Sequence, residues 1–348
     1  MAASKSNLFR GCKVISADKL EFKHSLIKSV FFFLISLNSG RYLPEFREIR
    51  KKHTDFIKLC LNSSLSAEIT LQPLKRFDLD AAIIFSDILI LPYGLKQTVE
   101  FKKNVGPILG DLNFDQVSKI TENDFIESVE PVYKAINLVR NNNLTEKKSI
   151  IGFVGAPWTL LVYILNKQSP KKKLEKNLFE NHSLTEQILN IIIKFLKIHI
   201  KNQINSGAEI IQIFDSWAGL LEDQDLDFYI YNPTSVLVEF TKSLNVPVIC
   251  FPRGIKDYKK YCEIVKPDAI CIDYEVDPIK IEKEIDIPIQ GGMNPKILLT
   301  DRESLKKETI KYLDIFKDHP YIFNLGHGVL PETDPNMMDY LVKTVKIY

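Results

Sequence analysis

Features typical of secreted, membrane-spanning and nucleic-acid-binding proteins are scarce in this 348-residue sequence. It has five cysteines and no Cys-x-x-Cys pair, which argues against a disulfide framework or structural zinc site and favours a reducing, cytoplasmic setting. Its 46 basic and 44 acidic residues leave a net charge of +2, so nothing indicates a nucleic-acid or membrane partner. An anionic ligand would have to be met by local positive charge.

Long apolar runs are also missing. The longest run near the N-terminus is Val30–Ser36 (VFFFLIS), which is far too short to span a bilayer. A signal peptide would place such a run closer to the start and follow it with small residues, whereas a long mixed segment precedes this one. The run is therefore expected to form a buried strand.

Short apolar runs recur along the whole chain and suit strands buried on both faces of a parallel sheet. They are Val30–Ser36, Ala81–Phe85, Ser149–Val154, Glu209–Phe214, Val246–Phe251, Ala269–Ile272, Ile287–Gln290 and Tyr321–Asn324. Between and after them the pattern predicts helices at Leu43–Cys60, Asn123–Asn141, Ser183–Ser206, Leu226–Leu244, Tyr258–Val265, Pro278–Glu284, Asp301–Phe316 and Asp339–Tyr348.

This alternation predicts an α/β protein with a single (β/α)8 TIM-type barrel over residues 29–348. Residues 1–28 form a divergent N-terminal segment. A doubly wound open sheet is the alternative, but no GxGxxG motif follows the first run, which weakens a dinucleotide-binding fold.

Polar and glycine-rich residues follow run after run, where barrels carry their catalytic groups. Asp87 follows the second run and is either a catalytic carboxylate or the cap of the next turn. His327 lies between two glycines after the last run and is either a ligand-binding side chain or a packed histidine. Ser216 and Tyr163 are weaker candidates, since such residues often cap a helix or pack a ring.

Three arginines, Arg41, Arg47 and Arg50, follow the first run and suggest a cationic loop suited to binding carboxylates. On a helix Arg47 and Arg50 would lie on the same side, so the alternative for at least one of them is a solvated surface charge that binds no ligand. Lys171-Lys172-Lys173 is interpreted as a solvated segment.

Five segments together resemble the uroporphyrinogen decarboxylase family. The resemblance runs from about Gly40 to the C-terminus. It is carried by Arg41–Arg47 (RYLPEFR), Thr70–Pro73 with Asp80–Leu89 (DAAIIFSDIL), Gly152–Thr159 (GFVGAPWT), Phe214–Gly219 (FDSWAG) and Asn324–Pro331 (NLGHGVLP).

The resemblance implies decarboxylation of the four acetate arms of uroporphyrinogen III to give coproporphyrinogen III, without metal or organic cofactor, by a homodimeric barrel. It implies that Asp87 accepts hydrogen bonds from pyrrole N–H groups and stabilises the cation formed during the reaction. The implied substrate-binding residues are Ser39, Arg41, Arg50, Asp87, Tyr163, Ser216 and His327.

The sequence departs from the family pattern just before this region. Where the family reads Met-Arg-Gln-Ala-Gly-Arg, this chain has Ser36-Leu37-Asn38-Ser39-Gly40-Arg41. Leu37 therefore replaces an arginine close to the reacting acetate, which raises the alternative of a porphyrinogen-binding pseudoenzyme. A corrinoid or thiol methyltransferase is a further alternative, but the sequence has no His-x-Cys zinc motif.

Overall fold

The computed structural model describes residues 31–32, 40–102, 105–170, 174 and 181–348. Its centre is an eight-stranded sheet in the order β1-β10-β9-β8-β7-β6-β5-β2, in which every neighbouring pair is parallel. The strands are β1 (Phe31–Phe32), β2 (Ala81–Ile83), β5 (Ser149–Gly155), β6 (Ile210–Asp215), β7 (Val248–Pro252), β8 (Ala269–Ile272), β9 (Ile289–Gly291) and β10 (Tyr321–Phe323).

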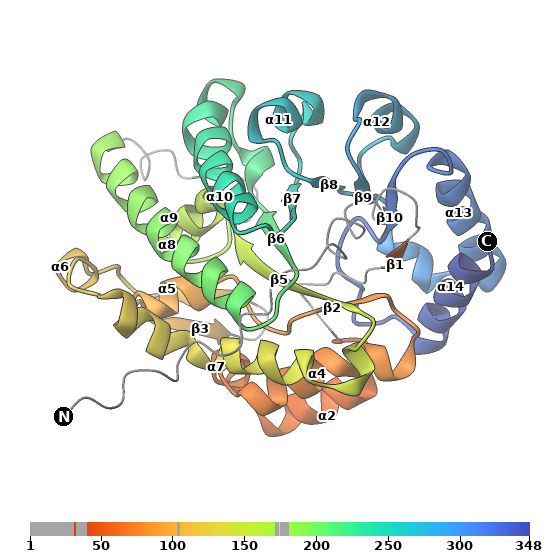
Figure 1. The fold of residues 1–348 in the computed structure, drawn as a ribbon, viewed down its shortest axis with the longest axis horizontal. Coiled ribbons are helices and arrows are strands. Elements are labelled where there is room, and N and C mark those ends of the chain that lie inside the picture. Colours follow the sequence, from red (N-terminus) through yellow and green to blue (C-terminus); the bar gives the residue numbers. More distant parts are fainter. Residues whose placement is uncertain (1–30, 33–39, 103–104, 171–173, 175–180) are drawn as a thin grey trace, which may run out of the picture.

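The sheet curls around the middle of the molecule and the helices cover its outside (Figure 1). All eight predicted runs contain a strand, because continuous apolar sequence can be buried on both faces. Every residue of β6, for example, is buried. Among the described residues β1 does not pair with β2, so they show a curled parallel sheet and not the predicted closed barrel. Most of the predicted first strand lies outside the described residues.

The helices are α2 (Pro44–Lys52), α3 (Phe56–Cys60), α4 (Ser63–Arg76), α5 (Ile90–Gly94), α6 (Phe114–Val117), α7 (Glu122–Arg140), α8 (Pro157–Asn166), α9 (His182–Asn205), α10 (Asn232–Ser243), α11 (Tyr258–Val265), α12 (Pro278–Glu284), α13 (Arg302–Ile315) and α14 (Pro335–Ile347). Short 3₁₀ turns cover Asn143–Thr145, Ala218–Leu220, Asp223–Asp225 and Pro295–Leu299, and a π-helical turn, Asp227–Tyr231, leads into α10.

The predicted helix Leu43–Cys60 is wrong as a single element, because it divides into α2 and α3. Arg50 donates to the carbonyl oxygens of His53 and Thr54 and so closes the end of α2. Asp55 then caps α3 by accepting from the Lys58 N–H group at 3.1 Å.

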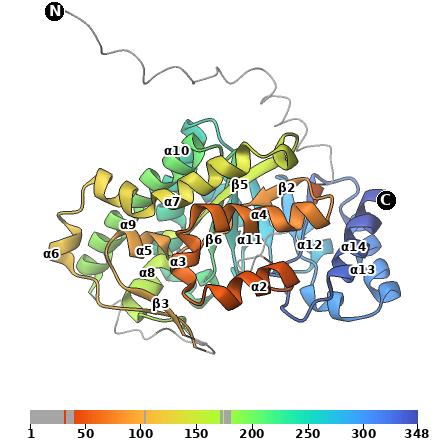
Figure 2. The ribbon, with the colours of Figure 1, turned by 90° about the horizontal axis from the view of Figure 1, so that it is seen from below.

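Two elements near the site were not predicted: α4 and an antiparallel hairpin of β3 (Val99–Lys102) and β4 (Gly106–Leu109). The hairpin packs on α3, where the ring centroids of Phe56 and Phe101 lie 4.7 Å apart. Figure 2 shows β3 at the edge of the molecule beside α2, α3 and α8.

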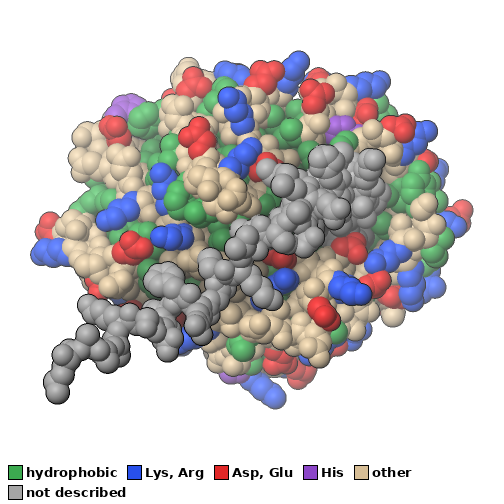
Figure 3. Space-filling model, viewed as in Figure 1, with side chains coloured by type: hydrophobic (Ala, Val, Ile, Leu, Met, Phe, Trp, Pro, Cys, Tyr) green, Lys and Arg blue, Asp and Glu red, His purple; other side chains and the backbone are tan. Residues whose placement is uncertain are grey.

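Charges of both signs are interspersed over the face drawn in Figure 3, as the small net charge leads one to expect. None of the helices within the described residues has the length and apolarity needed to cross a membrane.

Candidate active site

Asp87 lies just beyond the carboxyl end of β2, and helix α4 fixes the chain there. The Ser66 hydroxyl donates to the Phe85 carbonyl oxygen at 2.6 Å, and the Phe85 N–H donates to Thr70 Oγ1 at 2.8 Å. Both α4 side chains are buried, so these bonds are shielded from water. The unpredicted α4 is thus the element that holds the position of Asp87.

The Asp87 carboxylate caps the next turn through one oxygen only. Its Oδ1 accepts from the Leu89 N–H at 2.8 Å, and no bond to its Oδ2 is found among the described residues. Burial raises the pKa of Asp87 to about 6, while the Leu89 N–H and the Arg41 charge act in the opposite direction. The capping role is therefore shown, and one oxygen is left for a ligand.

Arg41 and Arg50 lie within electrostatic reach of each other and differ in how they are held. Burial lowers the pKa of Arg41, as does the Arg50 charge, whereas the Asp87 charge raises it. The Arg50 guanidinium is bonded to backbone carbonyls at the end of α2 and lies 5.4 Å from the centre of the Phe56 ring. Arg50 therefore has a structural task of its own, while Arg41 is the more exposed of the two.

Arg47 has a role that the sequence left open. Its Nε donates to the Arg41 carbonyl oxygen at 3.0 Å, and its terminal nitrogen donates to the Pro331 carbonyl oxygen. It thereby ties the loop after β1 to the loop after β10, which also carries His327.

Tyr163 extends the site from Asp87 towards β6. It is buried on α8, and its ring meets that of Trp217 edge-on at 6.0 Å between centroids. Burial raises the pKa of Tyr163, and the nearby Asp87 charge raises it further. Its hydroxyl lies 3.3 Å from Ser169 Oγ. Tyr163 therefore contacts Trp217, which follows Ser216, and is close enough to Asp87 to be affected by its charge.

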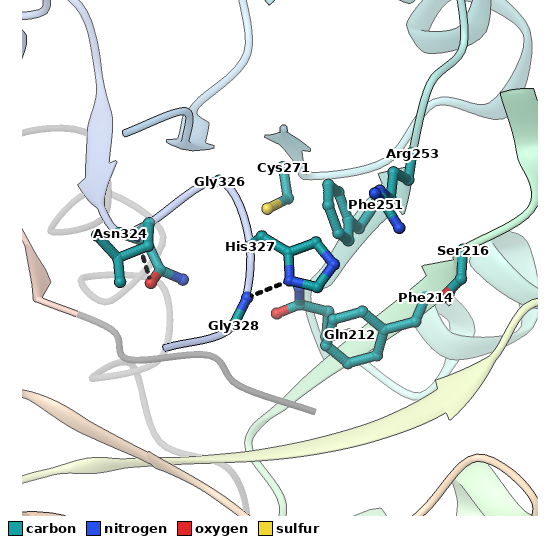
Figure 4. Close-up of a pocket in the computed structure, with 11 residues that line it drawn as sticks. Gln212, Phe214, Ser216, Phe251, Arg253, Cys271, Asn324, Gly326, His327 and Gly328 are labelled. Carbon is teal, nitrogen blue, oxygen red and sulfur yellow. Dashed lines mark hydrogen bonds between the residues drawn. The ribbon is translucent and has the colours of Figure 1, made fainter. Parts of the chain in front are cut away.

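A hollow opens at the ends of β6, β7 and β10 (Figure 4). Ser216 and His327 both line it, so the structure brings these two predicted residues together. Asp87, Arg41 and Tyr163 are not among its lining residues. The remaining lining residues are Gln212, Phe214, Phe251, Arg253, Cys271, Asn324, Leu325, Gly326 and Gly328.

His327 projects into this hollow from a tight turn (Figure 4). A side chain on Gly326 would meet the Tyr274 backbone nitrogen at 2.4 Å, so only glycine fits there. His327 Nδ1 accepts from the Gly328 N–H at 2.7 Å, which leaves Nε2 to carry the proton of the neutral ring. Burial lowers the pKa of His327, as does the Arg253 charge, while Asp273 raises it.

Arg253, Gln212 and Asp215 were not among the predicted site residues. Arg253 follows β7 and Asp215 ends β6, so the rule that pointed to Asp87 also applied to them. Asp215 Oδ1 accepts from the Thr159 hydroxyl at 2.6 Å, and burial raises the pKa of Asp215 to about 7. Gln212 is fully buried within β6, and no sequence signal separates it from a core residue.

Comparison with known protein families shows to which family this chain belongs. The family model described as uroporphyrinogen decarboxylase (URO-D) matches residues 33–348. This chain belongs to the uroporphyrinogen decarboxylase family. The uroporphyrinogen decarboxylase of Rickettsia bellii is 39% identical over 89% of this chain and 93% of its own length. That of Rickettsia africae is 38% identical over 89% of this chain and 91% of its own length.

Solved structures support the fold of this family member. A methyltransferase from Methanosarcina mazei has a TM-score of 0.71 at 15% identity, covering 94% of this chain and 98% of the other. A B12-independent methionine synthase from Shewanella has a TM-score of 0.51 at 12% identity, covering 82% of this chain and 85% of the other. At these identities the likeness concerns the fold alone.

The uroporphyrinogen decarboxylase segments of this chain converge on the ends of the parallel strands. Residues 80–89 contain β2 and Asp87, residues 152–159 join β5 to α8, and residues 214–219 join β6 to the turn with Ser216. Leu37, Asn38, Ser39 and the lysine run at 171–173 lie outside the described residues. Within the described part of the chain, no cluster of three or more His, Cys, Asp or Glu side chains is arranged to hold a metal ion.

Proposed function

We propose that this protein removes CO2 from the four acetate side chains of uroporphyrinogen III to give coproporphyrinogen III. The observation that carries the proposal is the match to uroporphyrinogen decarboxylases over 89% of the chain, at up to 39% identity among the relatives named above. No observation favours the pseudoenzyme alternative.

In this proposal Asp87 supplies the catalytic charge. Loss of CO2 from a pyrrole acetate needs an electron sink, and protonation of the pyrrole at a ring carbon creates a cation that accepts the electrons of the breaking bond. A carboxylate fixed beneath that cation stabilises it most where water is excluded. With a pKa of about 6, Asp87 is largely ionised at neutral pH and carries that charge.

The remaining site residues bind the substrate in this proposal. Arg41 and Arg50 pair with its carboxylates, and Ser39, Tyr163, Ser216 and His327 form hydrogen bonds to it. His327 fits because its Nε2–H faces the hollow, and Tyr163 fits because the Asp87 charge acts on it and its ring contacts that of Trp217, the residue after Ser216.

Several wider expectations belong to the same proposal. Residues 29–348 form one closed (β/α)8 barrel, in which the first strand completes the ring between β10 and β2, and residues 1–28 lie outside it. The parallel pairing of β1 with β10 supports this closure. The protein acts as a cytoplasmic homodimer without a cofactor.

Anaerobic turnover of uroporphyrinogen by the purified protein tests the function. The protein is first dialysed exhaustively against a chelator, and coproporphyrinogen is then measured with time. Sustained formation of coproporphyrinogen is expected. If the protein bound the tetrapyrrole but formed no coproporphyrinogen, the result would contradict the proposed decarboxylation and support the pseudoenzyme alternative.

A further inference from the structure

The hollow at the ends of β6, β7 and β10 presents hydrogen-bond donors and no acid. Arg253, His327, Ser216 and Gln212 line it, and no aspartate or glutamate is among its lining residues. The Gln212 side chain is fully buried, and its Nε2 has no hydrogen-bond partner in the described part of the protein. A buried donor without a partner is costly, which points to a ligand that accepts hydrogen bonds.

Arg253 stands on a rigid backbone. Its N–H donates to the Asp215 carbonyl oxygen at 3.0 Å, and its own carbonyl oxygen accepts from the Gly219 N–H at 3.0 Å. The next residue, Gly254, donates to Asp273 Oδ2 at 3.0 Å. The side chain therefore leaves a position fixed from both sides and extends towards the hollow (Figure 4).

The carboxyl groups near Arg253 each bond to other groups through at least one oxygen. Asp273 accepts the N–H groups of Gly254 and Glu275, and Asp215 Oδ1 accepts the Thr159 hydroxyl, while Asp215 Oδ2 has no hydrogen-bond partner in the described part of the chain. Within the described ranges the Arg253 guanidinium itself takes part in no hydrogen bond or ion pair. A half-buried guanidinium whose forked donors are free is suited to a carboxylate.

We infer that Arg253, with the Nε2–H of His327 and the amide of Gln212 beside it, binds a carboxylate arm that the substrate keeps. This inference rests on the proposed decarboxylation and assigns the hollow to substrate recognition. Arg253 is a substrate-binding residue, separate from the Asp87 side of the site where the reaction takes place.

The reason for assigning a retained carboxylate lies in the charge change of the reaction. A carboxylate that leaves as CO2 loses its negative charge in the transition state. A cation paired with it would hold the ground state more tightly than the transition state and would slow the reaction. The same cation on a carboxylate that persists binds both states alike, which improves binding without affecting the chemical step.

Three variants test this assignment: Arg253→Met, Arg253→Lys and the matched control Lys256→Met. Lys256 lies three residues further along, is 81% exposed and pairs with Asp223 at 3.6 Å, so its removal deletes the same charge outside the hollow. The measurements are KM and kcat for uroporphyrinogen, and fluorescence titration with uroporphyrin as a non-reacting octacarboxylate.

Arg253→Met is expected to raise KM about 10- to 100-fold while kcat stays within about threefold. Arg253→Lys should raise KM less, because a point charge replaces the fork, and Lys256→Met should match the unmodified protein. If Arg253→Met fails to fold, the smaller KM rise in Arg253→Lys carries the test. An unchanged KM, or a kcat that falls at constant KM, would overturn the assignment.

The titration separates this assignment from the proposed function. If the unmodified protein forms no coproporphyrinogen, the proposed function fails. Weaker uroporphyrin binding by Arg253→Met than by Lys256→Met would still support a carboxylate site. Equal binding by the two variants, or no binding by the unmodified protein, would overturn it.

Discussion

At the scale of single residues, Asp87 offers the sharpest test because its structural and catalytic roles use different properties. The Asp87→Asn variant keeps an Oδ1 that can accept the Leu89 N–H, so the cap and the fold are expected to survive. It loses the negative charge, and turnover should fall about 100- to 1,000-fold. Anaerobic coproporphyrinogen formation, with the thermal midpoint as the control for folding, measures both effects. Turnover close to that of the unmodified protein would rule out the catalytic role.

The same carboxylate predicts a pH dependence. Burial raises the pKa of Asp87 to about 6, so the group becomes protonated and neutral as the pH falls through that value. The value of kcat/KM should therefore decline as the pH falls, with an apparent pKa near 6. The residual activity of Asp87→Asn should not show this decline. A pH profile from 5 to 8 for both proteins checks this, and a limb of the same shape in both would assign it to another group.

At the scale of the element, α4 places Asp87 through a buried threonine. Thr70→Val removes the acceptor of the Phe85 N–H and leaves that buried donor unpaired, which should cost about 1–3 kcal/mol of unfolding free energy. Turnover should fall as well, since the chain that leads to Asp87 loosens.

Thr309→Val is the matched control for this substitution. Thr309 is also fully buried on a helix, but among the described residues its hydroxyl bonds only to the Leu305 carbonyl within α13. Urea unfolding and turnover of the two variants should differ, with the larger loss in Thr70→Val. Equal losses would mean that α4 has no special part in holding the site.

The segment before Arg41 carries a prediction that belongs to the loop as a unit. The double variant Leu37→Arg and Asn38→Gln restores the family's pattern and returns an arginine close to the reacting acetate, where it can donate the proton that the pyrrole carbon takes up. We expect the restored protein to turn over about 100-fold faster, a gain of a few kcal/mol in transition-state binding. The measurement is the anaerobic rate of coproporphyrinogen formation by the double variant and by the unmodified protein. Equal, fast rates would show that position 37 is dispensable, and no activity in either would point to a structural defect.

The elements that sequence reasoning predicted well are those whose signal is local. Continuous apolar runs located every strand of the parallel sheet, and the predicted helices Tyr258–Val265 and Pro278–Glu284 agree with α11 and α12, which Asp257 and Asp277 cap. Helix α4 was missed because seven of its residues are buried, several of them polar, so no apolar stripe shows in the sequence. The break between α2 and α3 depends on the Arg50 side chain, which no periodicity records.

The candidate site divides in the same way. Position after a strand made Asp87 and His327 candidates and Ser216 a weaker one, because strand ends meet at one end of the sheet, and the family resemblance then favoured their site roles. Arg253 occupies an equivalent position but was passed over. Its significance comes from neighbours that are distant in sequence, such as Asp273, whose carboxylate is already bonded to backbone N–H groups and leaves the guanidinium unpaired.

At the scale of the whole molecule, buried carboxyl groups predict how stability varies with pH. The pKa of Asp215 rises from 3.8 to about 7 in the folded protein, mainly through burial. Between these values the folded state binds more protons than the unfolded state, so stability falls as the pH rises through this window and levels off above it. Asp215→Asn, which stays neutral, should flatten the decline. Urea midpoints from pH 4 to 8 test this, and parallel curves for the two proteins would contradict it.

The Arg47 bridge also bears on how the protein is made. It joins residues 284 positions apart, and β1 pairs with β10 across nearly the same span. During synthesis a ribosome would have released Asp87, Tyr163 and Ser216 long before Pro331 emerges, and the bond from Arg47 to Pro331 cannot form until then. Contacts of such long range form late and slow the final step of folding. A nascent chain that lacks only its last strand and helix would thus contain most of the proposed site residues without the bridge that joins the two sides of the site.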